Sequence, residues 1–484
     1  MSSGCIGSCS TEPVQSVAMN RRLLLAACAI AIVHALFFIW YQRPDWTTQW
    51  SDQDGYRRLG QVLAETGKFT RFPDAPRFVP EVLRTPVYPA FVAVVFKLFG
   101  VGHVPVACAQ AVLFAVLCVV TYLAARRVVS ERVAAAAMLA VAVYPPFPYF
   151  GALVLTELWT TLLFTVSMVF AGRAWRAGAA PATFIALGIA LGLTALSRPV
   201  FVLFPLALVA AATLLLPILS IHERPALSKW LIMLGAFAIT MLPWFAYNYA
   251  TLGRFTLSPA GGVGRGLWEG SWQAKWSGRV QDELTHLADD IDDRAELDRR
   301  VAAVAEREHV PAGPMLEYVH QWEDIRRIWV DPVDPYERAL ARVKADQEYG
   351  RVARENLRRD STAQLVKRVA RGIFILWAAE IPVRRSDINA LSPIVIWTFW
   401  AIQAVLMLLA LRGLVVLVRA GLVSEAVLLA MPLVYITVVH IPLLTEARQS
   451  LPAKPIVLTL AVIAVMARRR SFAGESKIHE AQHL

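Results

Sequence analysis

The sequence predicts an all-α integral membrane protein that crosses the bilayer about ten times. Its 484 residues are 57% hydrophobic and only 18% charged, and the apolar residues form long runs separated by short charged breaks. A helix needs about 20 apolar residues to cross the hydrocarbon core. Only helices and closed barrels satisfy every backbone polar group in lipid, and these runs are far too long for barrel strands.

The expected spans follow from hydropathy and from the charges that flank each apolar run. Seven of them come before a long polar region, and three come after it. A further apolar segment, residues 86–100, is too short to be a span and is expected to form an interfacial helix. The approximate ranges of the spans are 23–41, 104–125, 133–149, 155–175, 182–196, 199–219, 230–249, 393–411, 425–443 and 455–466.

The positive charges between these spans orient the chain. Because basic loops stay on the cytoplasmic side, we expect the tails 1–21 and 468–484 to be cytoplasmic. The spans then form an N-terminal module, 22–250, and a C-terminal module, 393–467, and both the first outer loop, 42–103, and the region 251–392 are extracytoplasmic. The basic groups that agree on one side are Arg21/Arg22, Arg126/Arg127/Arg132, Arg173/Arg176, Arg224/Lys229, Arg412/Arg419 and Arg468–Arg470.

The outer region 251–392 reads as a set of amphipathic, strongly charged helices. It opens with the glycine-rich stretch Gly261–Gly266, which follows no predicted strand and matches no phosphate-binding fingerprint. A flexible exit from the seventh span is therefore the favoured interpretation. Trp268, Trp272 and Trp276 follow, and tryptophans at such a position are expected at the membrane interface.

Charge and cysteine content exclude some classes of function. The net charge of +11 is explained by arginines at the ends of apolar runs, where they meet anionic lipid, so nucleic-acid binding is not expected. Three of the five cysteines lie in apolar runs, and Cys5 and Cys9 lie in the N-terminal tail. We expect neither a disulfide framework nor a cysteine-based metal site.

Two carboxylates, Asp52 and Asp54, open the first outer loop within the sequence Ser-Asp-Gln-Asp-Gly-Tyr. One interpretation is structural, because Ser51 and Asp54 resemble a capping box and acids favour the first turn of a helix. The other is chemical: a carboxylate at this place acts as a general base toward an acceptor hydroxyl or amine. The sequence around the two residues leaves both open.

Other polar clusters fall on the same outer face, and their convergence favours the chemical interpretation. Charged residues at membrane depth are costly and mark functional sites, although single arginines there also reach the interface for solvation. The clusters are Leu83–Pro89, Leu155–Leu158, Leu196–Pro199, Pro243–Tyr249 and Thr445–Pro455.

The order of these clusters resembles a bacterial glycosyltransferase family related to protein O-mannosyltransferases and lipid A aminoarabinose transferases (glycosyltransferase family 39-like), which has the GT-C membrane fold. The resemblance covers roughly residues 20–265 and 390–467. It implies that Asp52, followed by Tyr56, is the catalytic base, with Asp54 as the second candidate. It also implies the bacterial cytoplasmic membrane, with the active site facing the periplasm.

The resemblance implies a polyprenyl-phosphate-linked sugar as donor and a lipid, polysaccharide or protein of the cell envelope, such as lipopolysaccharide, as acceptor. Arginine and lysine suit the charge that develops on a departing phosphate. We expect no cofactor and no essential metal, although Asp52 and Asp54 are able to bind a divalent ion. The donor-phosphate candidates are Arg84, Arg198, Arg448 and Lys454, and the acceptor or sugar candidates are Tyr56, Tyr88, Glu157 and Trp244.

The sequence departs from the family pattern at three places. Tyr247 stands where the family often has arginine, and Gln449 stands where it usually has tyrosine. The charged residues 270–380 match nothing in the family. These departures bear on the substrate more than on the reaction, which is expected to be an inverting sugar transfer on the outer face of the membrane.

Other functions remain open from the sequence alone. A transporter or lipid flippase is the first alternative, but ionisable residues in the middle of spans are few. A membrane anchor that presents residues 270–390 as a binding module is the second. Among enzymes, a glycan ligase with a diphosphate-linked donor is the nearest competitor.

Overall fold

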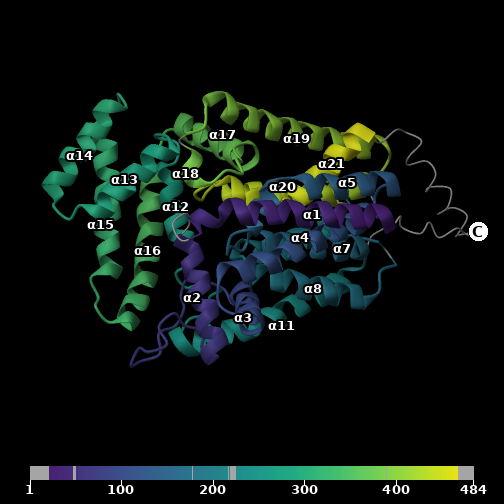
Figure 1. Cartoon of the computed structure of the whole chain (residues 1–484), viewed down its shortest axis with the longest axis horizontal. Coiled ribbons are helices and arrows are strands. Elements are labelled where there is room, and N and C mark those ends of the chain that lie inside the picture. The colour runs from purple at the N-terminus through teal and green to yellow at the C-terminus, as the bar shows by residue number, and fades with distance from the viewer. Residues whose placement is uncertain are drawn as a thin grey trace, which may run out of the picture.

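The computed structural model describes residues 21–46, 51–176, 178–215, 217, 225–388 and 390–466. These residues form an all-α structure without strands, which confirms the predicted fold class. A bundle of long helices runs along the horizontal axis of Figure 1, and a smaller group of helices, α13 to α16, projects from one end of it. Cys5, Cys9, Arg224 and Arg468–Arg470 lie outside the described residues.

A helix lies at each of the ten expected spans. Six segments of the described chain are long and apolar enough to cross a membrane, namely α1, α4, α11, α19, α20 and residues 447–466. The protein is thus a multi-pass membrane protein, while the exact number of spans stays a prediction. The helices are α1 (Arg21–Gln42), α4 (His103–Ala125), α5 (Glu131–Val143), α7 (Glu157–Ala174), α8 (Pro181–Ala195), α9 (Phe204–Ala210), α11 (Leu227–Leu252), α19 (Pro393–Arg419), α20 (Val423–His440) and α21 (Lys454–Met466).

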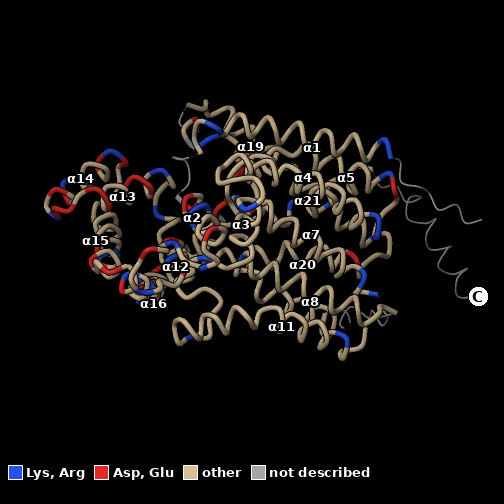
Figure 2. Tube along the Cα trace, turned by 60° about the horizontal axis from the view of Figure 1, so that its bottom comes forward, with Lys and Arg blue, Asp and Glu red and all other residues tan. Residues whose placement is uncertain are grey.

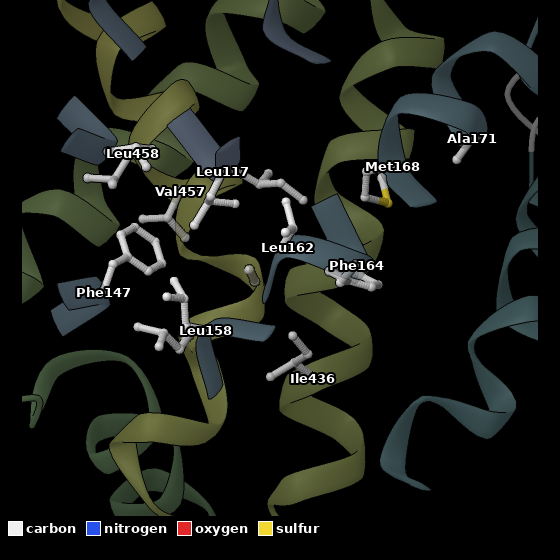
Figure 3. Packing of buried hydrophobic residues seen from close by; sticks show 14 of the residues in the cluster. Leu117, Phe147, Leu158, Leu162, Phe164, Met168, Ala171, Ile436, Val457 and Leu458 are labelled. Carbon is white, nitrogen blue, oxygen red and sulfur yellow. The ribbon is translucent and has the colours of Figure 1, made fainter. Parts of the chain in front are cut away.

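Helix α7 lies at the centre of the bundle, where it packs against α4 and α8. Most of its side chains are buried, and Leu158, Leu162 and Phe164 meet Phe147 and Ile436 from neighbouring segments (Figure 3). Lipid tails are as apolar as these side chains, so close packing rather than the hydrophobic effect holds the helices together. Because α7 begins at Glu157, this packing fixes a carboxylate at the end of the bundle that is predicted to face outward, called the outer end below.

Few charged residues lie in the middle of the bundle. Figure 2 shows mostly basic residues at the end of the bundle near the chain termini, and mixed acidic and basic residues over the projecting helices at the other end. Such a distribution is typical of a protein whose basic end faces the cytoplasm.

The outer end is built from two groups of helices. The first outer loop forms α2 (Ser51–Thr66) and α3 (Val87–Phe99), which pack against each other. The region 251–392 is helical, as predicted, and its helices are α12 (Val263–Trp272), α13 (Gly278–Asp290), α14 (Arg294–Arg307), α15 (Ala312–Val330), α16 (Pro335–Arg359), α17 (Thr362–Ala378) and α18 (Arg385–Ile388).

The tryptophans at the start of this region do not lie at a membrane interface, and that expectation is wrong. Trp268 and Trp272 are fully buried, and Trp268 stacks on Tyr318 with 4.9 Å between ring centroids. Together with Trp276 they belong to the hydrophobic core against which α13 to α16 pack. The charged helices pack against these large apolar side chains, which the tryptophan-rich stretch contributes.

Candidate active site

Helix α2 presents Asp52 at the outer surface of the bundle. Asp52 and Asp54 lie in its first turn, where acidic side chains interact favourably with the helix dipole. Gln53, between them, is buried: its Nε2 donates to the Trp46 carbonyl (3.2 Å) and its Oε1 accepts from the Val154 N–H (2.9 Å). Gln53 thus anchors the start of α2 to the bundle and leaves the Asp52 side chain 52% exposed.

Arg84 lies across the first turn of α2. Its Nη2 atom donates to Asp52 Oδ1 over 3.4 Å, and its guanidinium lies 4.8 Å from the centroid of the Tyr56 ring. A Cβ atom at Gly55 would overlap the Arg84 guanidinium, so a larger residue there would displace this end of the Arg84 side chain. The Arg84 side chain is only 9% exposed, and Nη1 lies 3.9 Å from Glu81 Oε1, but its Nε and Nη1 atoms have no hydrogen-bond partner among the described residues.

The loop that carries Arg84 is held by a buried carboxylate. Glu81 accepts a hydrogen bond from Arg71 Nε (2.7 Å) and another from the Leu83 N–H (2.9 Å). The Ala260 N–H donates to the Val82 carbonyl over 2.8 Å, which ties this loop to the segment that follows α11. The position of Arg84 is therefore set from both sides.

A second group of charges lies deeper, and we call Glu157, Arg198 and Arg448 the inner cluster. Arg448, on the 3-10 helix η4 (Ala447–Ala453), donates from Nη1 to Glu157 Oε1 over 3.3 Å and from Nη2 to Glu446 Oε2 over 2.9 Å. Arg198 Nη2 lies 3.9 Å from the same Glu157 oxygen. The Arg198 Nη1 and Glu157 Oε2 atoms are buried without a hydrogen-bond partner.

Asp52 connects this inner cluster to Arg84. Its Oδ1 atom accepts from Arg84, and its Oδ2 atom lies 3.9 Å from Arg448 Nη2. A carboxylate flanked by two guanidinium groups keeps a defined orientation. Three segments far apart in the sequence, around residues 52, 84 and 448, meet at this carboxylate.

A cavity of about 290 Å³ opens beside Asp52, and we call it the outer pocket. The first outer loop contributes Asp52, Tyr56 and Arg84 to its lining. The opposite wall comes from α12, α15 and α16 and includes Arg265, Trp329, Arg342, Asp346 and Tyr349. The pocket therefore lies between the first outer loop and the projecting helical region.

The glycine-rich stretch forms part of this pocket instead of a flexible exit from the bundle. Gly261 and Gly262 line the pocket, and α12 begins directly after them. Asp346 accepts hydrogen bonds from the Gly264 N–H (3.3 Å) and the Arg265 N–H (3.1 Å). A Cβ atom at Gly264 would overlap the Asp346 carbonyl, so glycine permits the close approach of α12 to α16.

The two tyrosines proposed for the sugar or acceptor lie together. Tyr56 and Tyr88 make an edge-to-face contact with 5.1 Å between centroids. Burial raises the pKa of Tyr56 to about 12, with Arg84 opposing and Asp52 and Glu157 adding to the shift. Tyr56 thus stays neutral at physiological pH, with its ring at the pocket lining.

The structure places Asp54, Lys454 and Trp244 away from the outer pocket. Asp54 is exposed and lies 3.5 Å from Arg57 Nη2. Lys454 is buried and donates to the Trp377 carbonyl and to Gln403 Oε1, each over 3.3 Å. Trp244 is also buried, and its Nε1 donates to the Leu257 carbonyl (2.6 Å) at the end of α11.

The departures from the family pattern have local structural roles. Tyr247 donates from its hydroxyl to the Phe69 carbonyl over 3.3 Å and stacks on Trp244. Gln449 accepts from the Glu446 N–H (3.1 Å), which caps η4, and donates to the Leu444 carbonyl (3.1 Å). Both residues stabilise backbone segments that carry charged side chains of the site.

Arg265, Arg342 and Asp346 were not singled out from the sequence. Arg265 lies within the glycine-rich stretch, whose fingerprint mismatch favoured a flexible segment. Arg342 and Asp346 lie on α16, where charged residues alternate with alanine and valine as on any solvated helix. Nothing in one sequence distinguishes these two residues from their neighbours on the helix.

No group of three His, Cys, Asp or Glu side chains that could hold a metal ion occurs in the part of the chain that the structure describes. The charges around Asp52 are mostly guanidinium groups, which suit an anionic ligand.

Residues 83–247 match the family described as dolichyl-phosphate-mannose-protein mannosyltransferase. The matched range includes Arg84, Glu157 and Arg198, while Asp52 and Arg448 lie outside it. The resemblance inferred from the sequence is confirmed over these residues. No curated protein sequence matches the chain.

The fold is similar to that of the archaeal oligosaccharyltransferase AglB from Archaeoglobus fulgidus in complex with an inhibitory peptide and a dolichol-phosphate. That comparison has a TM-score of 0.54 and 13% identity, and covers 92% of this chain and 50% of the other. The apo form of the Archaeoglobus fulgidus enzyme has a TM-score of 0.53 and 15% identity, with 93% and 51% covered. The chain thus spans about half the length of that enzyme, and the likeness shows a GT-C membrane fold.

ArnT from Cupriavidus metallidurans, bound to undecaprenyl phosphate, is a further match. Its TM-score is 0.40 at 15% identity, over 94% of this chain and 78% of that one.

Proposed function

We propose that this protein is an inverting glycosyltransferase that moves a sugar from a polyprenyl-phosphate donor to a cell-envelope acceptor on the outer face of the membrane. One observation carries the proposal: the Asp52 carboxylate lies between Arg84 and Arg448, 3.4 Å and 3.9 Å away, and lines a pocket. A general base needs access to a substrate proton and a fixed orientation. Asp52 has both.

In the proposed reaction, Asp52 accepts the proton of an acceptor hydroxyl or amine. The acceptor oxygen or nitrogen then forms a bond to the anomeric carbon from the face opposite the phosphate. The bond between that carbon and the phosphate oxygen breaks, and its electron pair leaves with the polyprenyl phosphate. Inversion follows because there is one displacement and no covalent intermediate.

The inner cluster is suited to the phosphate that leaves. Arg198 has a buried Nη1 atom without a hydrogen-bond partner, so a donor is available where negative charge develops. Arg448 lies beside Asp52 and keeps the phosphate close to the base. Fixed cations at the point where charge appears lower the barrier more than cations that must reorganise.

The remaining candidates take lesser parts in the proposal. Tyr56 presents a neutral ring at the pocket, suitable for stacking on a sugar face. Arg84 orients Asp52. Lys454, Trp244 and Tyr88 are buried in contacts that shape the bundle and its loops, and the mechanism does not require them to touch substrate.

The outer location is supported by charge and chemistry. The basic end of the bundle lies opposite the end that carries Asp52 (Figure 2), and basic ends face the cytoplasm. Nucleotide sugars are confined to the cytoplasm, so an enzyme that works on the other side needs a lipid-linked donor. We therefore assign the bacterial cytoplasmic membrane, with Asp52 facing the periplasm and no cofactor.

The test compares cell-envelope glycans by mass spectrometry in a deletion strain that carries the wild-type gene, Asp52→Asn or Asp54→Asn at equal membrane abundance. We expect the wild type to restore a lost glycan, and Asp52→Asn to reduce the transfer rate by about 10²- to 10⁴-fold. Asp54→Asn is the matched control and should retain activity, because Asp54 is exposed and pairs with Arg57 instead of the arginines around Asp52. Equal restoration by Asp52→Asn would refute the role of the base.

A further inference from the structure

The outer pocket carries a positive charge that its own acidic residues do not balance. Asp346 is occupied by the backbone N–H groups of Gly264 and Arg265, and Asp52 is paired with Arg84. Arg265 is paired with Glu269 over 2.9 Å. Arg342 makes no hydrogen bond or ion pair with any residue that the structure describes.

Arg342 is nevertheless held in one place. Its guanidinium lies 4.1 Å from the centroid of the Trp329 ring, and its side chain is half-buried against the pocket wall. Burial, together with the nearby cations Arg71, Arg84 and Arg265 and against the opposing effect of Glu81, lowers the pKa of Arg342 to about 10. Cations gathered in a partly buried site are unfavourable unless an anion joins them.

Arg84 adds unsatisfied hydrogen-bond donors to the same space. Among the described residues, its buried Nε and Nη1 atoms have no hydrogen-bond partner, although Nη1 lies 3.9 Å from Glu81 Oε1 and the side chain lines the pocket. Buried polar atoms in native proteins are nearly always hydrogen-bonded, so two such atoms in a pocket point to a ligand. Arginine forks match the oxygens of phosphate and carboxylate groups.

We propose that the outer pocket binds an anionic group of the acceptor, a phosphate monoester or a carboxylate, through Arg342 and the free donors of Arg84. The acceptor is then an acidic glycan or glycolipid whose attacking hydroxyl is directed toward Asp52. This inference rests on the proposed function for its biological meaning. The cations of the site then bind different ligands: those of the inner cluster bind the donor phosphate, and those of the outer pocket bind the acceptor.

The size and position of the pocket agree with this role. A volume of about 290 Å³ accommodates one small group such as a sugar residue with its anionic substituent. The wall that carries Arg342 belongs to α16, outside the residues that match the family.

Equilibrium binding to the purified full chain in detergent tests the proposal. The probes are glucose 6-phosphate, glucuronate and neutral glucose for the outer pocket, and undecaprenyl phosphate for the inner cluster. We expect at least one of the two anionic sugars to bind about tenfold or more tighter than glucose. Whichever of them binds more tightly identifies the anionic group as phosphate or carboxylate.

Three variants locate the binding. Arg342→Gln should weaken the anionic sugar about tenfold or more and leave undecaprenyl phosphate unchanged, whereas Arg198→Gln should do the reverse. Lys344→Gln removes a charge from the exposed face of the same helix and is the matched control. Thermal unfolding of each variant shows whether it is folded, and Arg342→Lys retains the charge if the glutamine variant is not.

The inference is overturned if glucose binds as tightly as both anionic sugars, or if Arg342→Gln leaves their binding unchanged. It is also overturned if Arg342→Gln weakens undecaprenyl phosphate equally, because the pocket would then belong to the donor. These outcomes are independent of turnover. Asp52→Asn could restore transfer as well as the wild type while binding of the anionic sugar still depends on Arg342. That result would refute the proposed function and leave the anion site in place.

Discussion

The inner cluster and the outer pocket both contain arginines close to Asp52, but they differ in how the positive charge of these arginines is balanced. In the inner cluster, Arg198 and Arg448 share the buried carboxylate of Glu157, which is only 2% exposed. In the outer pocket, which lies between two groups of helices, Arg342 lies against Trp329 and has no acidic partner within the described part of the chain.

The difference follows from the surroundings. At membrane depth, cations persist only when a partner is close, because unpaired charge there is very costly. At the outer surface, water and salt stabilise an unpaired guanidinium until a ligand arrives. The proposed phosphate site is therefore partnered and the proposed acceptor site is open to solvent, and each prediction below separates the two.

The largest effect is expected from Arg198→Gln. If Arg198 stabilises charge that develops on the leaving phosphate, its loss should lower kcat by about 10²- to 10³-fold. The KM for the acceptor should stay unchanged, because Arg198 does not line the outer pocket. Initial rates measured in membranes, with the acceptor identified by mass spectrometry, give both values. A change in acceptor KM alone would contradict the division into two sites.

A smaller effect is expected from Gly55→Ala, which acts between the two sites. The new methyl group would overlap the Arg84 guanidinium and displace it from Asp52. We expect turnover to fall about tenfold, since orientation of the base is lost while the base remains. Gly313→Ala is the control, because a Cβ atom at Gly313 meets no atom within 4 Å. Unchanged turnover in Gly55→Ala would show that Arg84 does not orient Asp52.

Ionic strength should affect ligand binding at the two sites differently, with a smaller effect than these substitutions have. Raising ionic strength from about 0.01 M to about 1 M shortens the Debye length from about 30 Å to about 3 Å. The acceptor KM should rise by roughly threefold, because the outer pocket is open to solvent, and binding of undecaprenyl phosphate should change less. Equal sensitivity of both ligands would argue against a buried donor site.

The smallest effect concerns Tyr56 at high pH. Its pKa is raised to about 12, above the ordinary value of 10, so the folded protein retains a proton that the unfolded chain loses between these values. The contribution to stability is complete below pH 10 and is lost as pH rises toward about 12. The midpoint temperature of thermal unfolding, Tm, should therefore fall less steeply with pH in Tyr56→Phe than in the wild type between these two pH values. Parallel curves would show that Tyr56 is not the buried group.

Some parts of the site are legible in the sequence and others are not. Asp52, Arg84, Glu157, Arg198 and Arg448 were proposed because each is a charged residue on the same predicted side and lies in a motif that resembles the family, which also implied their roles. Their proximity was an inference from that shared side, and the structure brings them within 4 Å of one another in pairs.

Lys454 satisfied the same criterion but is buried against Trp377 and Gln403. Position along the chain places a residue at one end of the bundle, but it does not say which way a side chain turns. The interfacial placement of the tryptophans failed for a related reason: an aromatic cluster serves a membrane surface and a small helical core equally well.

The sequence by itself determined the all-α membrane fold, the places of the helices and the side on which polar clusters gather. These properties are local, since the length of an apolar run and the charges beside it set the free energy of each span. Only the tertiary structure decided that Arg342 and Asp346 face Asp52, and that Gly55 and Gly264 allow the close approaches that form the pocket. Such contacts depend on how helices distant in the chain pack, which no single segment encodes.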